Sequence, residues 1–280
     1  MNALEIHGLC KSYGGFELDH IDLELPAGCV MGLIGENGAG KSTIIKLILD
    51  MIKRDGGSIS ILGRDNKKDL HLIKEDIGIV LDEVGIPAGL KAAQVDRIMS
   101  RVYKNWDGEL FRSYLHRLSV PVDRQFKELS RGNKMKLGIA VAMSHEAKLL
   151  ILDEATSGLD PVVRDEVLDI FMDYTRDEEH SILISSHIVS DLEKLCDYIA
   201  FLHEGKLLLC EEKDLLRERY GLIHCRPEEL KALPEGAVVG KRESSYGVEA
   251  MVRRDAVPEG LSVNPIDIEQ LFIFTVKGEK

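Results

Sequence analysis

Nine consecutive residues, Gly35–Thr43, have the types and spacing that suit the binding of a polyphosphate. They read G-E-N-G-A-G-K-S-T, follow the apolar segment 30–34 and precede the segment 44–49, which has helical spacing. Glycines let successive backbone N–H groups converge on phosphate oxygens, and a helix N-terminus adds the positive end of its dipole. Lys41 would bring a positive charge to the outer phosphates, and the Ser42 hydroxyl would bind Mg²⁺. The sequence therefore predicts a phosphate-binding loop, or P-loop, made by Gly35, Asn37, Gly38, Gly40, Lys41, Ser42 and Thr43.

A second segment, Leu149–Glu154, carries the acidic groups that hydrolysis at such a loop needs. It is an apolar run that ends on two carboxylates, Asp153 and Glu154. Adjacent residues at the end of a strand point to opposite sides, so the two acids can have different roles. We expect Asp153 to lie in the metal shell and Glu154 to take the proton of the attacking water. Such a pair is weak evidence alone, but beside a P-loop it indicates hydrolysis.

The hydrophobic pattern indicates which elements hold these groups in place. Residues 1–28 alternate between apolar and polar, as half-buried antiparallel strands do, with a turn at Gly14-Gly15. Continuous apolar runs at 30–34, 149–152 and 181–185 predict buried strands. Since open α/β sheets bind ligands at the carboxyl ends of their strands, the residues that follow these runs should share one site.

The rest of the chain divides into a helical stretch and a tail. Residues 90–146 are expected to be mostly helical, with Pro121 as an internal break. After Gly221 the apolar density falls and Gly, Pro and charged residues rise, which indicates a boundary there. In the tail, 237–239 and 246–252 are predicted to form a hairpin around Glu243-Ser-Ser245.

Composition limits the class of protein. The chain has 36 Lys and Arg against 48 Asp and Glu, a net charge of −12, which disfavours binding to nucleic acid over the whole surface. Its N-terminus lacks a signal-peptide pattern and no apolar run reaches the length of a membrane span, so work at a membrane requires a partner that supplies the spans. Five cysteines without a C-x-x-C pair fit free thiols in a reducing compartment.

Four further segments make the chain resemble the ATP-binding subunits of ABC transporters over about residues 1–215. Leu129–Asn133 is similar to the family's signature, usually L-S-G-G-Q, and Ser157–Pro161 is similar to the loop that crosses the family's dimer interface. His187 stands where the family has its switch histidine, and Tyr13 where it has an aromatic residue. Each likeness is unspecific alone, but all occur in the family's order around one P-loop.

The resemblance implies roles for these residues. Ser130 and Gly132 would open a helix whose free N–H groups bind the γ-phosphate held by a second subunit. Asp160 would belong to the same interface, His187 would contact the γ-phosphate, and Tyr13 would stack on adenine. The ordinary alternatives are a helix N-cap for Ser130, a backbone-bonded histidine for His187 and a plain strand aromatic for Tyr13.

The sequence departs from the family pattern at three positions. Arg131 and Asn133 replace the usual Gly and Gln of the signature, and Asp82 stands where the family normally has Gln. An ionised Asp accepts hydrogen bonds but cannot donate them, so we expect Asp82 to prefer Mg²⁺ and to join Ser42 and Asp153 as a metal ligand. The alternative for Asp82 is an exposed loop acid without a role.

These observations combine into one expectation for the fold. We expect an α/β protein: a P-loop NTPase core with a mostly parallel sheet, an N-terminal antiparallel β subdomain, a helical insert at about 90–146 and a small α+β extension. The ATPase domain would span 1–220 and the accessory region 221–280.

The expected function is an ATP-binding and ATP-hydrolysing transporter subunit that uses ATP and Mg²⁺. Lys41, Glu154 and His187 would be the catalytic residues. The partners would be a second ATP-binding subunit and a membrane permease, at the cytoplasmic face of the cell membrane, and no nucleic acid. The tail Ile268–Val276 resembles that of exporter-type subunits. The alternatives are a soluble ABC ATPase that acts on ribosomes or nucleic acid, and a module that binds ATP without hydrolysing it.

Overall fold

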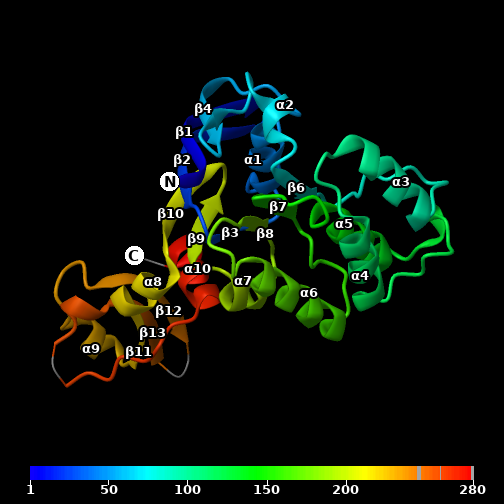
Figure 1. Cartoon of the computed structure of the whole chain (residues 1–280). Coiled ribbons are helices and arrows are strands. Elements are labelled where there is room, and N and C mark those ends of the chain that lie inside the picture. Colours follow the sequence, from blue (N-terminus) through cyan, green and yellow to red (C-terminus); the bar gives the residue numbers. More distant parts are fainter. Residues whose placement is uncertain (245–246, 259, 279–280) are drawn as a thin grey trace. The chain divides into compact units, whose positions relative to one another are not determined.

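The protein is described by a computed structural model that covers residues 1–244, 247–258 and 260–278 (Figure 1). It folds as two compact units, Met1–Leu209 (unit 1) and Cys210–Lys280 (unit 2). Unit 2 thus begins before the boundary near residue 220 that the composition suggests. The helix α8 (Lys213–Arg219) accounts for the difference, because the guanidinium of Arg254, in unit 2, donates to the carbonyl of Arg217 at 3.3 Å.

Unit 1 opens with a four-stranded sheet in the order β2-β1-β4-β5. The strands β1 and β2 are antiparallel, as predicted, and Tyr13 pairs with Phe16 across the Gly14-Gly15 turn. The apolar positions of the alternating pattern, such as Leu18 and Ile21, are fully buried. The bounds are β1 (Asn2–Tyr13), β2 (Phe16–Pro26), β4 (Gly56–Ile61) and β5 (Arg64–Asp65).

A second sheet of six strands carries the residues singled out above. Its order is β10-β9-β3-β8-β7-β6, and the five strands from β9 to β6 run parallel. The three predicted buried strands are β3, β8 and β7, side by side within it. Their carboxyl ends therefore meet at one edge. The bounds are β3 (Val30–Gly35), β6 (Ile77–Val80), β7 (Leu149–Asp153), β8 (Ser181–Ser185), β9 (Tyr198–His203) and β10 (Lys206–Glu212).

Both faces of this six-stranded sheet are covered, which explains the unbroken apolar runs of its strands. In Figure 1, α1 lies above β3 and β8, and α6 and α7 lie below them. On the α7 side the packing is close, because a Cβ added to Gly32 would lie 3.4 Å from Cβ of Leu192. The bounds are α1 (Lys41–Ile48), α2 (Leu70–Ile73), α6 (Pro161–Tyr174) and α7 (Val189–Leu195).

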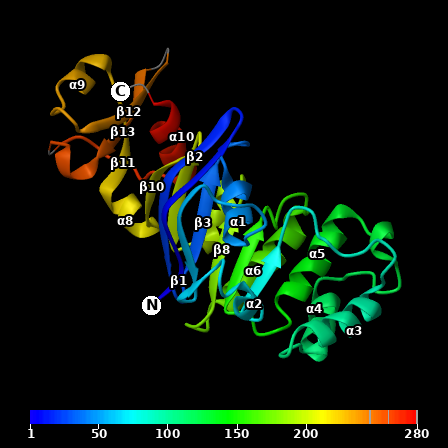
Figure 2. The ribbon, with the colours of Figure 1, turned by 90° about the horizontal axis from the view of Figure 1, so that it is seen from above.

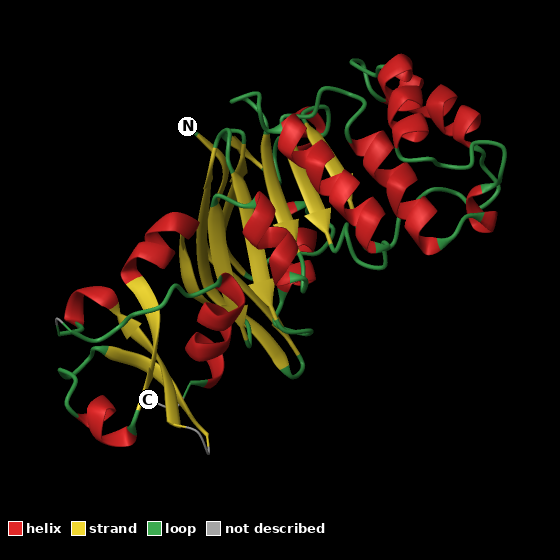
Figure 3. Ribbon diagram, turned by 90° about the horizontal axis from the view of Figure 1, so that it is seen from below, coloured by secondary structure: helices red, strands yellow, loops and turns green. Residues whose placement is uncertain are grey.

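The predicted helical insert is confirmed, and it gathers at one end of unit 1 (Figures 1 and 2). It consists of helices and loops, drawn red and green in Figure 3. The expected break at Pro121 falls between α4 and the short helix η1. The helix α5 packs against β6 and the loop after it, because a Cβ on Gly138 would lie 3.1 Å from the Val84 side chain. The bounds are α3 (Ala92–Val102), α4 (Gly108–Arg117), η1 (Phe126–Glu128) and α5 (Arg131–Ala142).

Unit 2 is a small α+β structure built on a three-stranded sheet in the order β11-β13-β12. The strands β12 and β13 form the predicted hairpin, although residues 245 and 246, at its turn, lie outside the described part of the chain. The tail segment Ile268–Val276 forms α10. The bounds are β11 (Tyr220–Cys225), α9 (Pro227–Lys231), β12 (Val238–Ser244), β13 (Gly247–Arg253), η2 (Arg254–Ala256) and α10 (Ile268–Lys277).

None of the helices in the described residues is long and apolar enough to pass through a membrane.

Candidate functional site

A cavity of about 570 Å³ opens at the edge where the parallel strands of the six-stranded sheet end. Its walls come from the P-loop, the start of β2, the loop after β6, the first residue of α5 and the segments that follow β7 and β8. Side chains far apart in the sequence therefore share one pocket. The lining residues are Phe16, Glu36, Asn37, Gly38, Gly40, Lys41, Ser42, Thr43, Asp82, Arg131, Glu154, Ser157 and His187.

The P-loop joins β3 to α1 through a backbone that only glycine adopts readily. Gly40 has φ +114° and forms the N-cap of α1. At Gly35 the loop passes so close to β9 that a Cβ would lie 2.5 Å from the carbonyl oxygen of Leu202. These two glycines therefore allow the path that the loop takes between β3 and α1.

Lys41 lies at the start of α1 and is almost fully buried. Its Nζ donates to the carbonyl oxygens of Gly35 at 2.7 Å and Glu36 at 3.3 Å, which folds the side chain back along the P-loop. Burial lowers the pKa of the Lys41 ammonium below its ordinary value of 10.5, and the carboxylates of Glu154 and Asp153 oppose that shift. The lysine is thus a desolvated cation, held in place and close to both acids, as a phosphate ligand should be.

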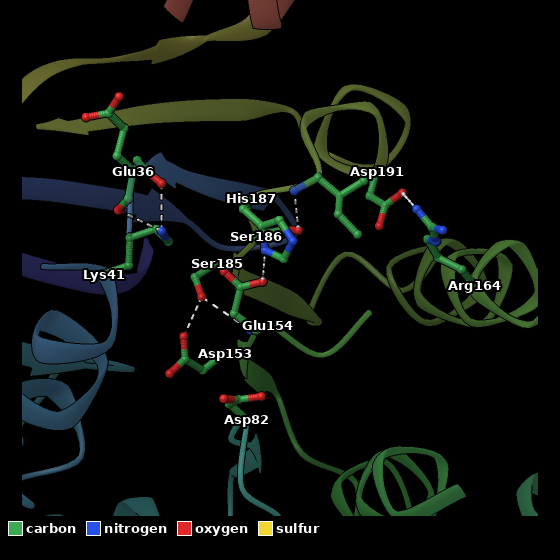
Figure 4. A network of polar contacts seen from close by, with 12 residues as sticks. Glu36, Lys41, Asp82, Asp153, Glu154, Arg164, Ser185, Ser186, His187 and Asp191 are labelled. Carbon is green, nitrogen blue, oxygen red and sulfur yellow. Dashed lines mark hydrogen bonds and ion pairs between the residues drawn. The ribbon is translucent and has the colours of Figure 1, made fainter. Parts of the chain in front are cut away.

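The two acids at the end of β7 have different partners, and Glu154 lies just beyond the strand, which ends at Asp153. Asp153 is buried and its Oδ1 accepts a hydrogen bond from Oγ of Ser185 at 2.5 Å. The backbone N–H of Glu154 donates to the carbonyl oxygen of Ser185 at 3.1 Å. Ser185, which the sequence analysis did not single out, therefore orients the end of β7 from the neighbouring strand β8 (Figure 4).

Glu154 is held in a constrained backbone conformation. Its φ is +53°, in the left-handed region that non-glycine residues rarely occupy, and such strain clusters at functional sites. Oε2 of Glu154 lies 2.6 Å from Nδ1 of His187, which follows β8, so the carboxylate accepts a hydrogen bond from the ring (Figure 4). An acid and a histidine from adjacent strands thus form a hydrogen-bonded pair beside the P-loop.

An ion pair near His187 connects α6 to α7. Nη1 of Arg164 is 3.9 Å from Oδ1 of Asp191, whose side chain is buried. Burial raises the pKa of Asp191 above 3.8, while Thr156 and Arg164 counteract that rise. The pair, in which only Asp191 is buried, connects α6 to the helix that follows His187 (Figure 4).

Ser130 forms the N-cap of α5, which agrees with the ordinary alternative for this residue, and its contact with a second subunit's phosphate stays a prediction. Oγ of Ser130 accepts a hydrogen bond from the backbone N–H of Asn133 at 3.2 Å. A Cβ on Gly132 would lie 3.4 Å from the side chain of Leu159, so this turn packs against the loop that follows β7. Asp160 caps α6 in the same way, accepting from the N–H of Val163 at 3.2 Å.

Two residues that depart from the expected pattern meet in the pocket wall. Nη2 of Arg131, the first residue of α5, lies 2.6 Å from Oδ1 of Asp82, in the loop after β6. Each residue stands out separately in the sequence, but no sequence pattern indicates their contact.

Most of the sequence-predicted site residues converge, and a few lie elsewhere. The cavity wall holds Asn37, Gly38, Gly40, Lys41, Ser42, Thr43, Asp82, Glu154 and His187. Six predicted residues lie outside the wall. Gly35 accepts a hydrogen bond from the wall residue Lys41, and Asp153 and the wall residue Glu154 both bond to Ser185. The other four are Tyr13, Ser130, Gly132 and Asp160. Phe16 lines the cavity in the region where an aromatic residue was expected, whereas Tyr13, its cross-turn neighbour, is 45% exposed.

Comparison with known proteins identifies the family. The model of the family described as ABC transporter matches residues 18–157, which include the P-loop and both acids. The chain belongs to the ABC transporter family. In this family it is an ATP-binding subunit with ATPase activity, and the fold is that of a P-loop NTPase with the mixed sheets described above.

Curated relatives of this ABC subunit carry transport names. The lantibiotic transport ATP-binding protein SrtF of Streptococcus pyogenes is 37% identical over 215 residues, 75% of this chain and 91% of that protein. The bacitracin transport ATP-binding protein BcrA of Bacillus licheniformis is 35% identical, over 75% of this chain and 70% of its own length. The ABC transporter ATP-binding protein YtrB of Bacillus subtilis is 27% identical over 99% of both chains. Transport proteins among the relatives favour the transporter interpretation over the soluble alternative.

Solved structures support the same fold. An ATP-binding subunit of an ABC transporter superposes with a TM-score of 0.68 and 26% identity, covering 77% of this chain and 92% of that one. The dimeric ABC cassette MJ0796 gives a TM-score of 0.68 at 18% identity, covering 75% and 98%, which bears on the fold alone.

Proposed function

We propose that this chain powers an export transporter by hydrolysing MgATP in the cavity at the edge of its parallel sheet. The observation that carries the proposal is the pair formed by Glu154 and His187 at 2.6 Å, in the wall that also holds the P-loop. In this arrangement a water beside the γ-phosphate has a carboxylate base within reach, and that base is oriented by a neighbouring ring.

The P-loop would hold the polyphosphate. Backbone N–H groups of Gly38–Thr43 and the N-terminus of α1 provide donors and a positive dipole end. Lys41 exchanges its carbonyl acceptors for phosphate oxygens, a stronger charge-assisted interaction. Phe16 offers an aromatic surface at the cavity wall, and the stacking of adenine on Tyr13 stays a prediction.

The oxygen atoms of the side chains at the cavity are of the kind that Mg²⁺ prefers as ligands. The Ser42 hydroxyl lines the cavity, and the Asp153 carboxylate is oriented by Ser185. Among the described residues no cluster of three or more His, Cys, Asp or Glu is arranged to bind a metal. Mg²⁺ is commonly bound by one or two carboxylates together with phosphates and waters, and here Asp153 and Asp82 would supply the carboxylates beside the Ser42 hydroxyl. When bound, the ion neutralises charge on the phosphates.

Hydrolysis then requires one proton transfer. The water oxygen forms a bond to the γ-phosphorus, the bond to the bridging oxygen of ADP breaks, and Glu154 accepts the proton of the water. His187 keeps the carboxylate aimed at the cavity through its hydrogen bond.

The partners are inferred from the relatives and from the exposed start of α5. Relatives named for lantibiotic, bacitracin and daunorubicin or doxorubicin transport or resistance support an export role with a separate membrane permease. Ser130 and Gly132 stand outside the cavity wall of their own subunit, which suits a second ATP-binding subunit whose nucleotide they would contact. The complex would lie at the cytoplasmic face of the cell membrane.

Replacing Lys41 tests the assignment of the pocket. Lys41→Ala should weaken MgATP binding by about tenfold or more, because the phosphates lose a charged donor worth roughly 1.5–3 kcal/mol. The matched control is Lys46→Ala, which removes an exposed lysine from the same helix. Isothermal titration with ATP would measure both. Equal ATP affinity for Lys41→Ala and wild type would show that nucleotide does not bind at this P-loop.

A further inference from the structure

The backbone around His187 is fixed by two hydrogen bonds at the start of α7. The hydroxyl of Ser186, which is fully buried, accepts from the N–H of Ile188 at 3.0 Å (Figure 4). The N–H of Asp191 donates to the carbonyl oxygen of Ile188 at 3.2 Å. The ring of His187 is 53% exposed and lines the nucleotide cavity. The histidine therefore presents its ring to the cavity from a fixed backbone.

The hydrogen bond to Glu154 limits what the other ring nitrogen of His187 can do. Nδ1 lies 2.6 Å from Oε2 of Glu154, and an ionised carboxylate only accepts, so Nδ1 carries a proton. In a neutral imidazole Nε2 is then an acceptor, which cannot donate to a phosphate oxygen. The ring can donate to a phosphate and to Glu154 at the same time only as an imidazolium, with both nitrogens protonated.

A buried carboxylate on α7 favours this charged form of the ring. Asp191 lies in the first turn of α7 and is 4% exposed. Burial raises the pKa of Asp191, and Thr156, Arg164 and His187 all oppose that rise. The interaction between Asp191 and His187 is mutual, because a negative charge near an imidazole stabilises its protonated form.

The ion pair with Arg164 leaves part of the charge on Asp191 without a partner. Nη1 of Arg164 is 3.9 Å from Oδ1 of Asp191, well beyond the distance of a charge-assisted hydrogen bond. In the described part of the chain, Oδ2 of Asp191 and Nε of Arg164 are both buried and have no hydrogen-bond partner. Since water is excluded there, the remaining charge on Asp191 acts more strongly than that of an exposed acid.

We propose that Asp191 is a positioning residue, which stabilises His187 as an imidazolium that donates from Nδ1 to Glu154 and from Nε2 to the γ-phosphate. This inference rests on the proposed function, because it places a γ-phosphate in the cavity. The ring keeps both protons during turnover, and Glu154 accepts the proton of the water. Other charged side chains near the ring are unchanged in the variants of Asp191 and Arg164 below: Glu36, Lys41, Asp82 and Arg131 of the cavity wall, Asp153, which accepts from Ser185, and Lys194 of α7.

Titration of the His187 ring in the nucleotide-free protein tests the electrostatic part of the proposal. In protein with ¹³C-labelled histidine, the Cε1 signal of His187 is identified by its absence from the NMR spectrum of His187→Gln. Its chemical shift is then followed from about pH 5 to pH 9. In Asp191→Asn the midpoint should be about 0.5–1 pH unit lower than in the wild type, because a neutral amide of the same size does not stabilise the charged ring.

Two further variants separate this effect from a structural one. Arg164→Gln removes the cation that opposes the charge on Asp191, so the midpoint should rise by about 0.3–0.5 pH unit. A loosened contact between α6 and α7 would instead move the midpoint in the same direction in Asp191→Asn and in Arg164→Gln. The matched control is Asp169→Asn, because Asp169 of α6 is an exposed carboxylate 3.1 Å from Nζ of Lys194 of α7. It should leave the midpoint within about 0.2 pH unit.

Turnover tests the catalytic part. With saturating MgATP, the fall of kcat at high pH should begin at a lower pH in Asp191→Asn than in the wild type, and at the wild-type pH in Asp169→Asn. An unchanged NMR midpoint in Asp191→Asn, shifts of the same sign in Asp191→Asn and Arg164→Gln, or kcat profiles that fall at the same pH would each overturn the inference. If Asp191→Asn did not fold, the absence of a rise in Arg164→Gln would still contradict it. Failure of the wild type to bind and hydrolyse ATP would instead contradict the proposed function.

Discussion

At the level of single residues, Ser185 is an example of a site residue whose contact the sequence alone does not indicate. The apolar segment before Asp153 and Glu154 predicts that these two acids have different roles, because they stand at the end of a strand. Which side chain orients them depends on the neighbouring strand, 32 residues away, through the bond from Ser185 to Asp153. The contact of Arg131 with Asp82, 49 residues apart, was hidden for the same reason. Sequence predicts the chemistry of such residues, whereas only the fold decides their partners.

Replacing Ser185 should weaken the metal site. In Ser185→Ala the Asp153 carboxylate loses its donor, and we expect Mg²⁺ affinity in the presence of ATP, or turnover, to fall about 10-fold. The matched control is Ser181→Ala at the other end of β8, where an equally buried hydroxyl accepts from the N–H of Gly28 and lies away from the cavity. Titrating ATPase activity against Mg²⁺ measures both. Overlapping curves for Ser185→Ala and wild type would show that Ser185 does not contribute to the metal site.

At the scale of elements, the parallel strands could be predicted because both faces of their sheet are buried and the runs are continuous. The helical insert was predicted only as a range, since its helices are joined by long loops whose ends depend on packing. His145 illustrates this, because it lies just after α5 and contacts the first residue of β6. Its Nε2 is 3.0 Å from the carbonyl oxygen of Ile77, and its ring stacks on Tyr103 with centroids 3.9 Å apart. No pattern in the sequence marks this histidine.

His145 should make the stability of the protein sensitive to acid. Burial lowers the pKa of its imidazole below 6.5, although the carbonyls of Ile77 and Val141 favour the protonated ring. As the pH falls below about 6.5, the unfolded chain therefore binds a proton that the folded chain resists, and the free energy of unfolding falls. Above that pH the contribution is fully present.

The variant His145→Gln keeps a donor for Ile77 but cannot titrate. Its urea midpoint should fall less between pH 7.5 and pH 5.5 than that of the wild type. His116→Gln, at an exposed position on α4, is the control and should keep the wild-type slope. If His145→Gln lost stability over this pH range as steeply as the wild type, another group would be responsible.

In the whole molecule, a core that contains the residues matched by the family model is followed by the smaller unit 2. The core was predictable because ordered motifs fix it: the P-loop, the acids after β7 and the histidine after β8 all follow parallel strands. The extent of unit 2 was less predictable, because α8 looks like the end of the core in composition. Its last turn is instead bonded to Arg254, which also donates to the carbonyl of Tyr220 at 2.8 Å. The amino-acid composition of a segment reflects how far it is exposed to solvent, but it does not indicate such long-range hydrogen bonds.

The catalytic role of Glu154 is tested most directly by the rate of phosphate release from saturating MgATP, compared between the wild type and Glu154→Gln. The amide cannot accept the proton of the water, so turnover should fall about 100-fold or more while ATP affinity stays within a few-fold. Glu166→Gln, an exposed position on α6, should hydrolyse ATP at the wild-type rate. If Glu154→Gln also released phosphate at the wild-type rate, Glu154 would not be the base, and the catalytic role proposed for its pair with His187 would be wrong.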